Sequence, residues 1–183
     1  MRLFVGVDCE GLAAGIADVQ ECFAGASGVR PVDPEGAHVT LEFLGDVDET
    51  ALDELVDALD AAIAEADVGP FRVTVGGLGA FPSADYIRVL WLGVREGARE
   101  LTRLHEAIEA RTVELGFEPA EHEFSPHVTI ARMDHAGGKE RVQEVLSAAD
   151  PTAGSLRVAE VRLKESVRGD EGPEYATVER FAL

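Results

Sequence analysis

The feature that most constrains this chain is a short pattern that occurs twice, His38-Val39-Thr40-Leu41 and His127-Val128-Thr129-Ile130. In a β-strand, the side chains at positions i and i+2 lie on the same face. Each copy therefore places an imidazole beside a threonine hydroxyl on one face and two aliphatic side chains on the other. Two such strands brought together would supply two imidazoles for proton transfer and two hydroxyls for holding an anion, whereas one copy supplies only half of such a site.

The order of the predicted elements repeats around the two motifs. A buried strand ending at Asp8 is followed by a helix, a loop, the first motif and another helix. A buried strand ending at Val94 is followed by the same series of elements around the second motif. This layout predicts one bilobal domain over residues 1–183, with duplicated halves at roughly 1–80 and 85–183 and with terminal strands that can be exchanged between the lobes.

The predicted fold class is α+β. Duplicated halves related by a pseudo-two-fold axis would bring the motif strands side by side, with antiparallel sheets lining a central cleft and the helices packed outside. The chain is predicted to end in a hairpin, with strands at 156–167 and 175–183 on either side of a turn at 169–173. Gly76-Gly77-Leu78-Gly79 lacks the lysine and the helix start of a phosphate-binding loop and predicts a bend in or after a strand.

The charge of the chain limits its partners. There are 35 acidic and 16 basic residues, for a net charge of −19, and the only lysines are Lys139 and Lys164. An acidic surface poor in lysine indicates adaptation to high salt, where screening removes the self-repulsion; an acidic protein of a low-salt organism is the alternative. This charge disfavours non-specific binding to the phosphates of nucleic acid, so a nucleic-acid substrate must be held locally, at an end or a special group.

Cysteine and histidine spacing predicts no metal centre. Cys9 and Cys22 are isolated and are expected to be free thiols in a reducing compartment. His105 is predicted to be structural and His122 and His135 to be solvated, and none of them forms a metal cluster. The sequence shows no signal-peptide pattern and no apolar run that could span a bilayer, so we expect a cytoplasmic protein with no membrane partner. We also expect a monomer.

The two motifs and their flanks, together with four other segments, resemble a known family. They are residues 2–8 (RLFVGVD), 38–45 (HVTLEFLG), 77–82 (GLGAFP), 89–94 (VLWLGV), 124–132 (FSPHVTIAR) and 172–175 (GPEY). Together they resemble the 2H phosphoesterase superfamily, which is named for its paired His-x-Thr motifs. Within it the chain is most similar to the RNA 2′,3′-cyclic phosphodiesterases, also called the 2′-5′ RNA ligase family, and the resemblance extends over nearly the whole chain.

The resemblance implies a bilobal fold, no metal or organic cofactor, and hydrolysis of RNA ends that carry a 2′,3′-cyclic phosphate to 2′-phosphate ends. It also implies 2′-5′ RNA ligation as a reverse activity. In the family, the first motif histidine is the proton donor and the second the acceptor, which gives these roles to His38 and His127. Related members often carry more basic residues near the cleft, and this acidic chain departs from them there.

The chemistry of such a reaction suits these residue types. Opening a cyclic phosphodiester needs an activated water, a proton for the leaving oxygen and support for the charge on the phosphoryl oxygens. Two imidazoles can transfer both protons near neutral pH and should titrate as a coupled pair. We therefore predict His38 and His127 as catalytic residues and Thr40, Thr129 and Arg132 as substrate-binding residues. In a regular strand Arg132 would lie on the opposite face, so it reaches phosphate only if the strand twists or bulges. Structural pairing with an acidic neighbour is the alternative for this side chain.

Two other functions stay open at this point. The same chemistry could act on another small cyclic phosphate, such as a cyclic nucleotide or ADP-ribose cyclic phosphate. The chain could also be a non-catalytic nucleotide-binding module, although intact histidines and threonines in both motifs argue against it. Among the aromatic residues, Phe43 is predicted to pack in the core, while Phe81 and Tyr175 remain candidates for stacking on a base.

Overall fold

The computed structural model describes residues 1–170 and 172–183. Within them the strands form one antiparallel sheet in the order β7-β4-β5-β6-β3-β1-β8-β9, and β2 pairs with β6. The strands are β1 (Arg2–Asp8), β2 (Val29–Pro31), β3 (His38–Asp46), β4 (Phe71–Pro82), β5 (Ile87–Glu96), β6 (His127–Met133), β7 (Thr152–Val158), β8 (Glu160–Arg168) and β9 (Pro173–Ala182). The α-helices are α1 (Ala13–Glu21), α2 (Leu52–Ala66), α3 (Ala98–Glu114) and α4 (Lys139–Ala148). The α+β class is confirmed, with one continuous sheet in place of separate ones.

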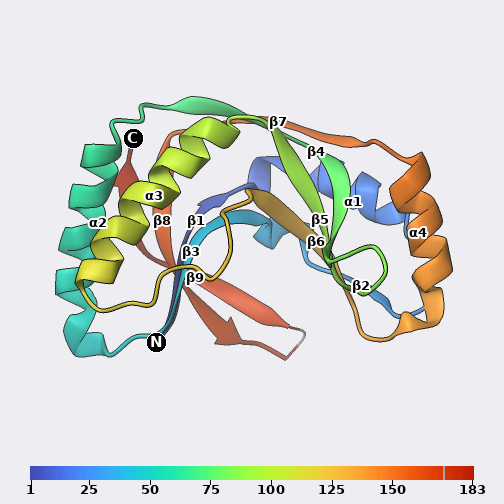
Figure 1. Ribbon diagram of the computed structural model, residues 1–183, viewed down its shortest axis with the longest axis horizontal. Coiled ribbons are helices and arrows are strands. Elements are labelled where there is room, and N and C mark those ends of the chain that lie inside the picture. The colour runs from blue at the N-terminus through green and yellow to red at the C-terminus, as the bar shows by residue number, and fades with distance from the viewer. Residues whose placement is uncertain (171) are drawn as a thin grey trace.

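The strand order is symmetric about the pairing of β3 with β6. The outer strands on the β3 side are β1, β8 and β9, and those on the β6 side are β5, β4 and β7. Strands that lie far apart in the sequence are thus neighbours on each side of the sheet. The helices follow the same division, because α2 and α3 lie together on one side and α1 and α4 on the other (Figure 1). The duplication of the two halves stays a prediction.

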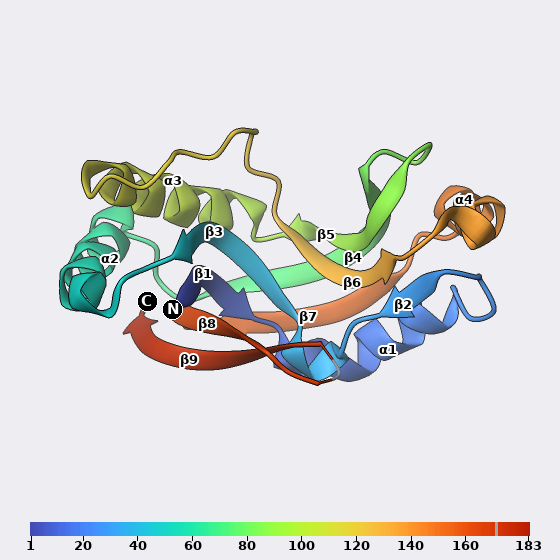
Figure 2. The ribbon, with the colours of Figure 1, turned by 90° about the horizontal axis from the view of Figure 1, so that it is seen from below.

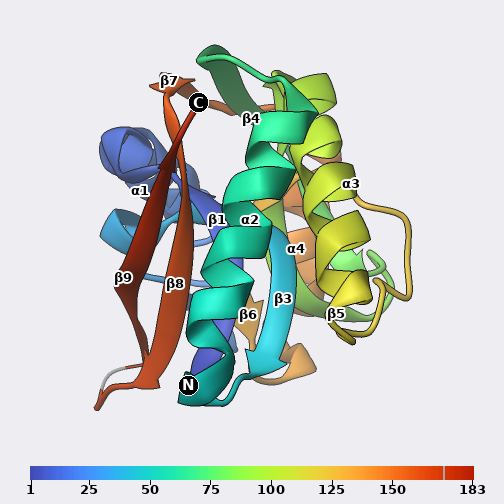
Figure 3. The same cartoon turned by 90° about the vertical axis from the view of Figure 1, so that its left-hand side faces the viewer.

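The sheet curls between these two helical groups (Figure 2). Seen from its side, α2 stands between the β8–β9 hairpin and α3 (Figure 3). Helix α2 buries an apolar stripe that includes Leu55, Leu59 and Ile63, and it packs against α3, which buries Leu101 and Ile108. Such stripes arise because apolar residues recur at helical spacing. In the described part of the chain, no helix has both the length and the apolar character needed to cross a membrane.

The last third of the chain differs from the prediction. The single strand expected at 156–167 is two strands, because β7 pairs with β4, whereas β8 pairs with β1 and β9. Extended, alternating sequence runs through Ala159, and the pattern of one strand cannot show that its partners change there. The turn expected at 169–173 does join β8 to β9, with residue 171 outside the described residues.

The bend predicted at 76–79 is present within β4. The register of β4 against β5 shifts between Val75 and Leu78. Gly79 is needed there for a second reason, since a Cβ at this position would overlap the indole ring of Trp91 in β5. The glycines therefore bend the strand and make room for an aromatic ring.

Candidate active site

The two motifs lie at the centre of the sheet, where β3 and β6 pair with Val39 opposite Val128. Both valines are fully buried, so their neighbours in each strand point to the other face. The side chains that share this other face are His38, Thr40, His127 and Thr129. In antiparallel register, each imidazole lies across from the threonine of the other motif. The structure thus brings together the four motif residues that the sequence predicts for the site.

Both imidazoles are held in the same way at the first residue of their strand. Nδ1 of His38 lies 2.8 Å from the carbonyl oxygen of Gly36, and Nδ1 of His127 lies 2.7 Å from that of Ser125. A carbonyl oxygen only accepts, so Nδ1 carries a proton and donates it in both rings. Nε2 is therefore the atom of each ring that is left to exchange a proton with a substrate.

Aromatic rings surround each imidazole. The ring centroid of His38 lies 4.9 Å from that of Phe4 and 4.9 Å from that of Tyr175, which is edge-on. The His127 ring has Phe81 edge-on, also at 4.9 Å. Burial lowers the pKa of both imidazoles, against the raising effect of the hydrogen bonds at Nδ1. Both rings are therefore mainly neutral at pH 7 in the free protein.

A β-bulge lies at the fourth residue of each motif. The extra residue is Leu41 in β3 and Ile130 in β6, and neither has a partner in the strand on the outer side. An extra residue exchanges the faces of all residues beyond it. The fifth residue after each motif histidine, Phe43 in β3 and Arg132 in β6, therefore points to the same face as the imidazoles.

Arg132 reaches the site face because of this bulge, which is one of the two conditions that the sequence set for it. Its side chain is exposed, and no ion pair to it is found within residues 1–170 and 172–183. Burial raises the pKa of Tyr175 and the positive charge of Arg132 opposes this rise, so the guanidinium lies within electrostatic range of the phenol beside His38. A cation without a partner, in a strongly acidic chain, is suited to binding an anion.

The prediction that Phe43 packs in the core is wrong. Its side chain is 75% exposed, and its ring lies 6.0 Å from that of Phe4, on the face of the imidazoles. The bulge at Leu41 is the physical reason, since it turns Glu42 inward and Phe43 outward. An exposed aromatic ring beside a polar site provides a surface on which a base can stack.

The inward residue of this bulge is a buried carboxyl group. Glu42 is 8% exposed, and its Oε1 accepts a 2.6 Å hydrogen bond from Thr112 Oγ1 of α3. Its Oε2 has no hydrogen-bond partner among the described residues. Burial raises the pKa of Glu42 to about 7, although the bond from Thr112 acts in the opposite direction. The corresponding residue of the β6 bulge is Ala131, which carries no charge.

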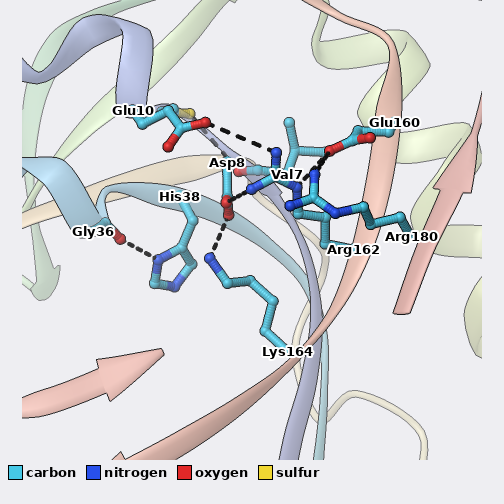
Figure 4. A network of polar contacts seen from close by, with 10 residues as sticks. Val7, Asp8, Glu10, Gly36, His38, Glu160, Arg162, Lys164 and Arg180 are labelled. Atoms are coloured by element: carbon cyan, nitrogen blue, oxygen red, sulfur yellow. Dashed lines mark hydrogen bonds and ion pairs between the residues drawn. The ribbon is translucent and has the colours of Figure 1, made fainter. Parts of the chain in front are cut away.

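A charged network lies beside His38 (Figure 4). Asp8 is opposite His38 in the register of β1 and β3. Its Oδ1 accepts a 2.6 Å bond from Nζ of Lys164, and its Oδ2 accepts a bond from Arg162. Lys164 is only 6% exposed, and its Nζ lies 5.9 Å from the centre of the Tyr175 ring. Two largely buried cations therefore share one carboxylate next to the first imidazole.

This network distinguishes the two histidines. After burial and the bond to Gly36, the pKa of His38 is lowered by Lys164 and raised by Asp8. Among the described residues, burial lowers the pKa of His127 and the bond to Ser125 raises it, and no charged side chain contributes. Sequence reasoning missed this network; its one signal was that Lys164 is one of only two lysines in the chain.

The remaining histidines behave as predicted. His105 is buried and structural, with Nδ1 2.8 Å from the carbonyl oxygen of Leu41 and its ring stacked 4.3 Å from Phe124. His122 and His135 are exposed. In the part of the chain that the structure describes, no three His, Cys, Asp or Glu side chains are grouped so that they could hold a metal ion.

Comparisons with known proteins agree with this geometry. The sequence profile of the 2′-5′ RNA ligase superfamily matches residues 10–170. An RNA 2′,3′-cyclic phosphodiesterase of Aeropyrum pernix is 38% identical over 151 residues, which is 82% of this chain and 84% of that protein. An RNA 2′,3′-cyclic phosphodiesterase of Methanothermobacter thermautotrophicus is 34% identical over 186 residues, covering 100% of this chain and 99% of that protein.

Solved structures give the same picture. TT0787 of Thermus thermophilus superposes with a TM-score of 0.82 and 28% identity, covering 100% of this chain and 98% of that one. E. coli LigT complexed with 3′-AMP superposes with a TM-score of 0.78 and 25% identity, covering 100% and 97%. A profile match over most of the chain, together with relatives above 30% identity along its length, confirms the resemblance seen in the motifs: the chain belongs to the 2′-5′ RNA ligase superfamily.

Proposed function

We propose that this protein is an RNA 2′,3′-cyclic phosphodiesterase, which hydrolyses 2′,3′-cyclic phosphate ends to 2′-phosphate ends. The observation that carries the proposal is the pair of imidazoles on one face of the sheet. In each ring Nδ1 donates to a backbone carbonyl, and Nε2 has no hydrogen-bond partner among the described residues. The relatives named RNA 2′,3′-cyclic phosphodiesterase support the choice of substrate.

The reaction requires one neutral and one protonated imidazole. His127 takes a proton from a water molecule, and the oxygen of that water attacks phosphorus. His38 gives a proton to the 3′-oxygen as the bond between phosphorus and the 3′-oxygen breaks. These roles follow the resemblance to the family. Lys164 is consistent with them, because a nearby cation makes the imidazolium of His38 a stronger acid. A bound phosphodiester anion favours protonation of one ring, which burial alone disfavours.

The phosphoryl oxygens need donors that are in place before the reaction. We propose that the hydroxyls of Thr40 and Thr129 and the guanidinium of Arg132 supply them, since all three lie on the face of the imidazoles. Negative charge develops on these oxygens in the transition state, and donors already fixed in position stabilise it most effectively. With the 5′-hydroxyl of a second RNA end in place of water, the same groups would form a 2′-5′ linkage.

The terminal nucleoside gives the site its second contact. We propose that Phe43 stacks on the base, because its exposed ring lies along the same face as the reacting phosphate. E. coli LigT binds 3′-AMP, which supports a site for one terminal nucleotide. Both motifs come from one chain, so the site needs no second copy, and a cytoplasmic monomer stays a prediction.

One assay tests the proposal. Pure protein is incubated at high salt with EDTA and with mononucleotides and oligonucleotides that end in a 2′,3′-cyclic phosphate. We expect a 2′-phosphate product and loss of hydrolysis in the His38→Ala and His127→Ala variants. The proposal fails if wild-type protein hydrolyses none of these substrates, or if both variants hydrolyse them as fast as wild type. A 3′-phosphate product would contradict proton donation to the 3′-oxygen.

The alternative substrate class is separated in the same assay. A phosphodiesterase for a cyclic nucleotide or an ADP-ribose cyclic phosphate would hydrolyse that compound with a higher kcat/KM than an oligonucleotide end. A non-catalytic module would bind the nucleotides without turnover. The free Nε2 atoms on a shared face favour catalysis over binding alone.

A further inference from the structure

Each bulge behind the site is bound by a helix side chain. Nδ1 of His105, in α3, donates to the carbonyl oxygen of Leu41 at 2.8 Å. Nε2 of Gln20, in α1, donates to the carbonyl oxygen of Ile130 at 2.9 Å and to that of Val32 at 2.8 Å. Leu41 and Ile130 are the two extra residues of the bulges. The same backbone irregularity is therefore held twice, by two donors of different chemical type.

The two donors occupy corresponding places in the fold. Helix α1 follows β1 and carries Gln20, while α3 follows β5 and carries His105. Strands β1 and β5 are the outer neighbours of the two motif strands, and they are the strands against which the bulges form. The sequences of the two helices are unlike, yet both place a side-chain donor on the carbonyl of the extra residue.

The bulge decides which side chains face the substrate. Without the extra residue in β6, Ala131 would point to the site and Arg132 would point toward the helices, where its guanidinium would lose water. Without the extra residue in β3, Glu42 would face the site and Phe43 would face the helices. A donor fixed on the carbonyl of one residue favours the register in which that residue is the extra one, because a buried carbonyl needs hydrogen-bond partners. The carbonyl oxygen of Ile130 also accepts a 3.1 Å bond from the backbone N–H of Val32, so Gln20 is its second donor.

We propose that Gln20 and His105 are positioning residues of the active site, which hold the bulges that aim Arg132 and Phe43 at the substrate. Neither donor touches the substrate, since both lie on the face opposite to the imidazoles. The inference rests on the proposed function, because it assigns a role to residues behind that site. It predicts two separate couplings, Gln20 with Arg132 and His105 with Phe43.

The experiment is a pair of double-mutant cycles. Gln20→Met and His105→Leu remove each donor and keep a side chain of similar size. Each is measured in the wild-type, Arg132→Ala and Phe43→Ala backgrounds, by kcat/KM on an RNA end with a cyclic phosphate and by calorimetric binding of 2′-AMP. The temperature is chosen so that circular dichroism shows every variant to be folded.

The expected pattern is specific to each pair. Gln20→Met should lower kcat/KM and 2′-AMP affinity by about 3- to 10-fold in the wild-type and Phe43→Ala backgrounds, and by less than about twofold in the Arg132→Ala background. His105→Leu should lower both quantities by the same factor in the wild-type and Arg132→Ala backgrounds, and by less than about twofold in the Phe43→Ala background. A matched control is Gln143→Met, because Gln143 also donates to a backbone carbonyl, that of Ala84 at 2.7 Å, but away from the bulges. It should change neither quantity by more than about twofold.

A conservative variant separates the effect of the hydrogen-bond donor from the effect of side-chain packing. His105→Asn keeps a side-chain N–H donor and should stay within about threefold of wild type, whereas His105→Leu should not. Equal losses in all three backgrounds would overturn the inference, and so would a folded His105→Asn as weak as His105→Leu. If wild-type protein hydrolyses no cyclic phosphate, the proposed function fails by itself, and the 2′-AMP cycles still decide whether the donors aim these two side chains.

Discussion

The His38 half and the His127 half of the site have the same backbone geometry and different surroundings. In both, Nδ1 is bound to a carbonyl, an aromatic ring stands edge-on at 4.9 Å, and a bulge lies at the fourth residue of the motif. Only His38 has a buried ammonium nearby, and its bulge exposes a phenylalanine where the other exposes an arginine. Repeated backbone structure thus supplies two equivalent imidazoles, and side chains outside the motifs make them different.

The largest expected effect is loss of either imidazole. His38→Ala and His127→Ala should each lower kcat/KM by about 10²- to 10⁴-fold, because each removes one of the two proton transfers. The measurement is hydrolysis of a cyclic-phosphate end under saturating and limiting substrate. His122→Ala, at an exposed histidine, should match wild type. Near-normal turnover in one variant would show that only one half of the pair is catalytic.

Arg132 and Phe43 should differ in which part of the substrate they hold. Arg132→Ala should lower kcat/KM by about 10- to 100-fold on any cyclic phosphate, since a charge-assisted contact to phosphate is lost. Phe43→Ala should cost about 5- to 100-fold on a nucleotide end and nothing on ribose 2′,3′-cyclic phosphate, which has no base. Comparing the two substrates in both variants is the measurement. A Phe43→Ala loss on the base-free substrate would contradict stacking.

The Lys164→Met substitution removes the buried ammonium that lies near His38. The ammonium disfavours the imidazolium of His38, so its loss should raise the pKa of that ring, with no direct effect on the pKa of His127. With His38 as the proposed acid, the basic limb of the pH profile of kcat/KM should move to higher pH. Asp8 keeps its bond to Arg162 in this variant.

Imidazole proton resonances and the pH profile measure the two effects of this change. Lys139→Met, at the other lysine, is the control and should alter neither. A shift of the acidic limb instead of the basic one would reverse the roles of the two histidines. In wild type, both lowered pKa values place the optimum of kcat/KM below about pH 6.5, the ordinary pKa of histidine.

The smallest effect on activity is expected for a change at Glu42. The residue at the same place in the β6 bulge is Ala131, which carries no charge. The pKa of Glu42 is raised from 4.5 to about 7 by burial, so the folded state binds a proton more tightly than the unfolded chain does. The stability from this group is present in full below pH 4.5 and is lost as the pH rises through about 7. At pH 8, Glu42→Gln should therefore raise the free energy of unfolding by at most about 3 kcal/mol, and with it the melting temperature, and the gain should be much smaller at pH 5.

Thermal unfolding followed by circular dichroism at the two pH values tests this prediction. Glu106→Gln, at an exposed position of α3, should show no such pH dependence. Turnover of the Glu42→Gln variant should equal that of wild type, since the carboxyl faces the helix and not the substrate. A destabilised variant at pH 8 would show that the carboxylate is better accommodated than its burial suggests.

Much of the site follows from the residues alone. His38, Thr40, His127 and Thr129 share a face because alternation in a strand is local, and two copies of one motif imply a site with two equal parts. Strand β6 begins at His127, the first residue of the second motif, directly after Pro126. The family resemblance resides in these same local segments.

Other features depend on which strands become neighbours. The single alternating segment at 156–167 divides into β7 and β8 because its two parts pair with different strands, and no local pattern records a change of partner. The network of Asp8, Arg162 and Lys164 joins β1 to β8, which are far apart in the sequence. Its members therefore look like ordinary charged residues until the sheet is assembled.

The sequence by itself determined the two imidazoles, their threonine neighbours and the family. Only the tertiary structure decided that Arg132 and Phe43 lie on the face of the imidazoles and that one imidazole lies beside a buried ammonium. The physical reason is that a bulge is a mismatch between two paired strands, held here by donors from α1 and α3, so it exists only once strands and helices have packed together.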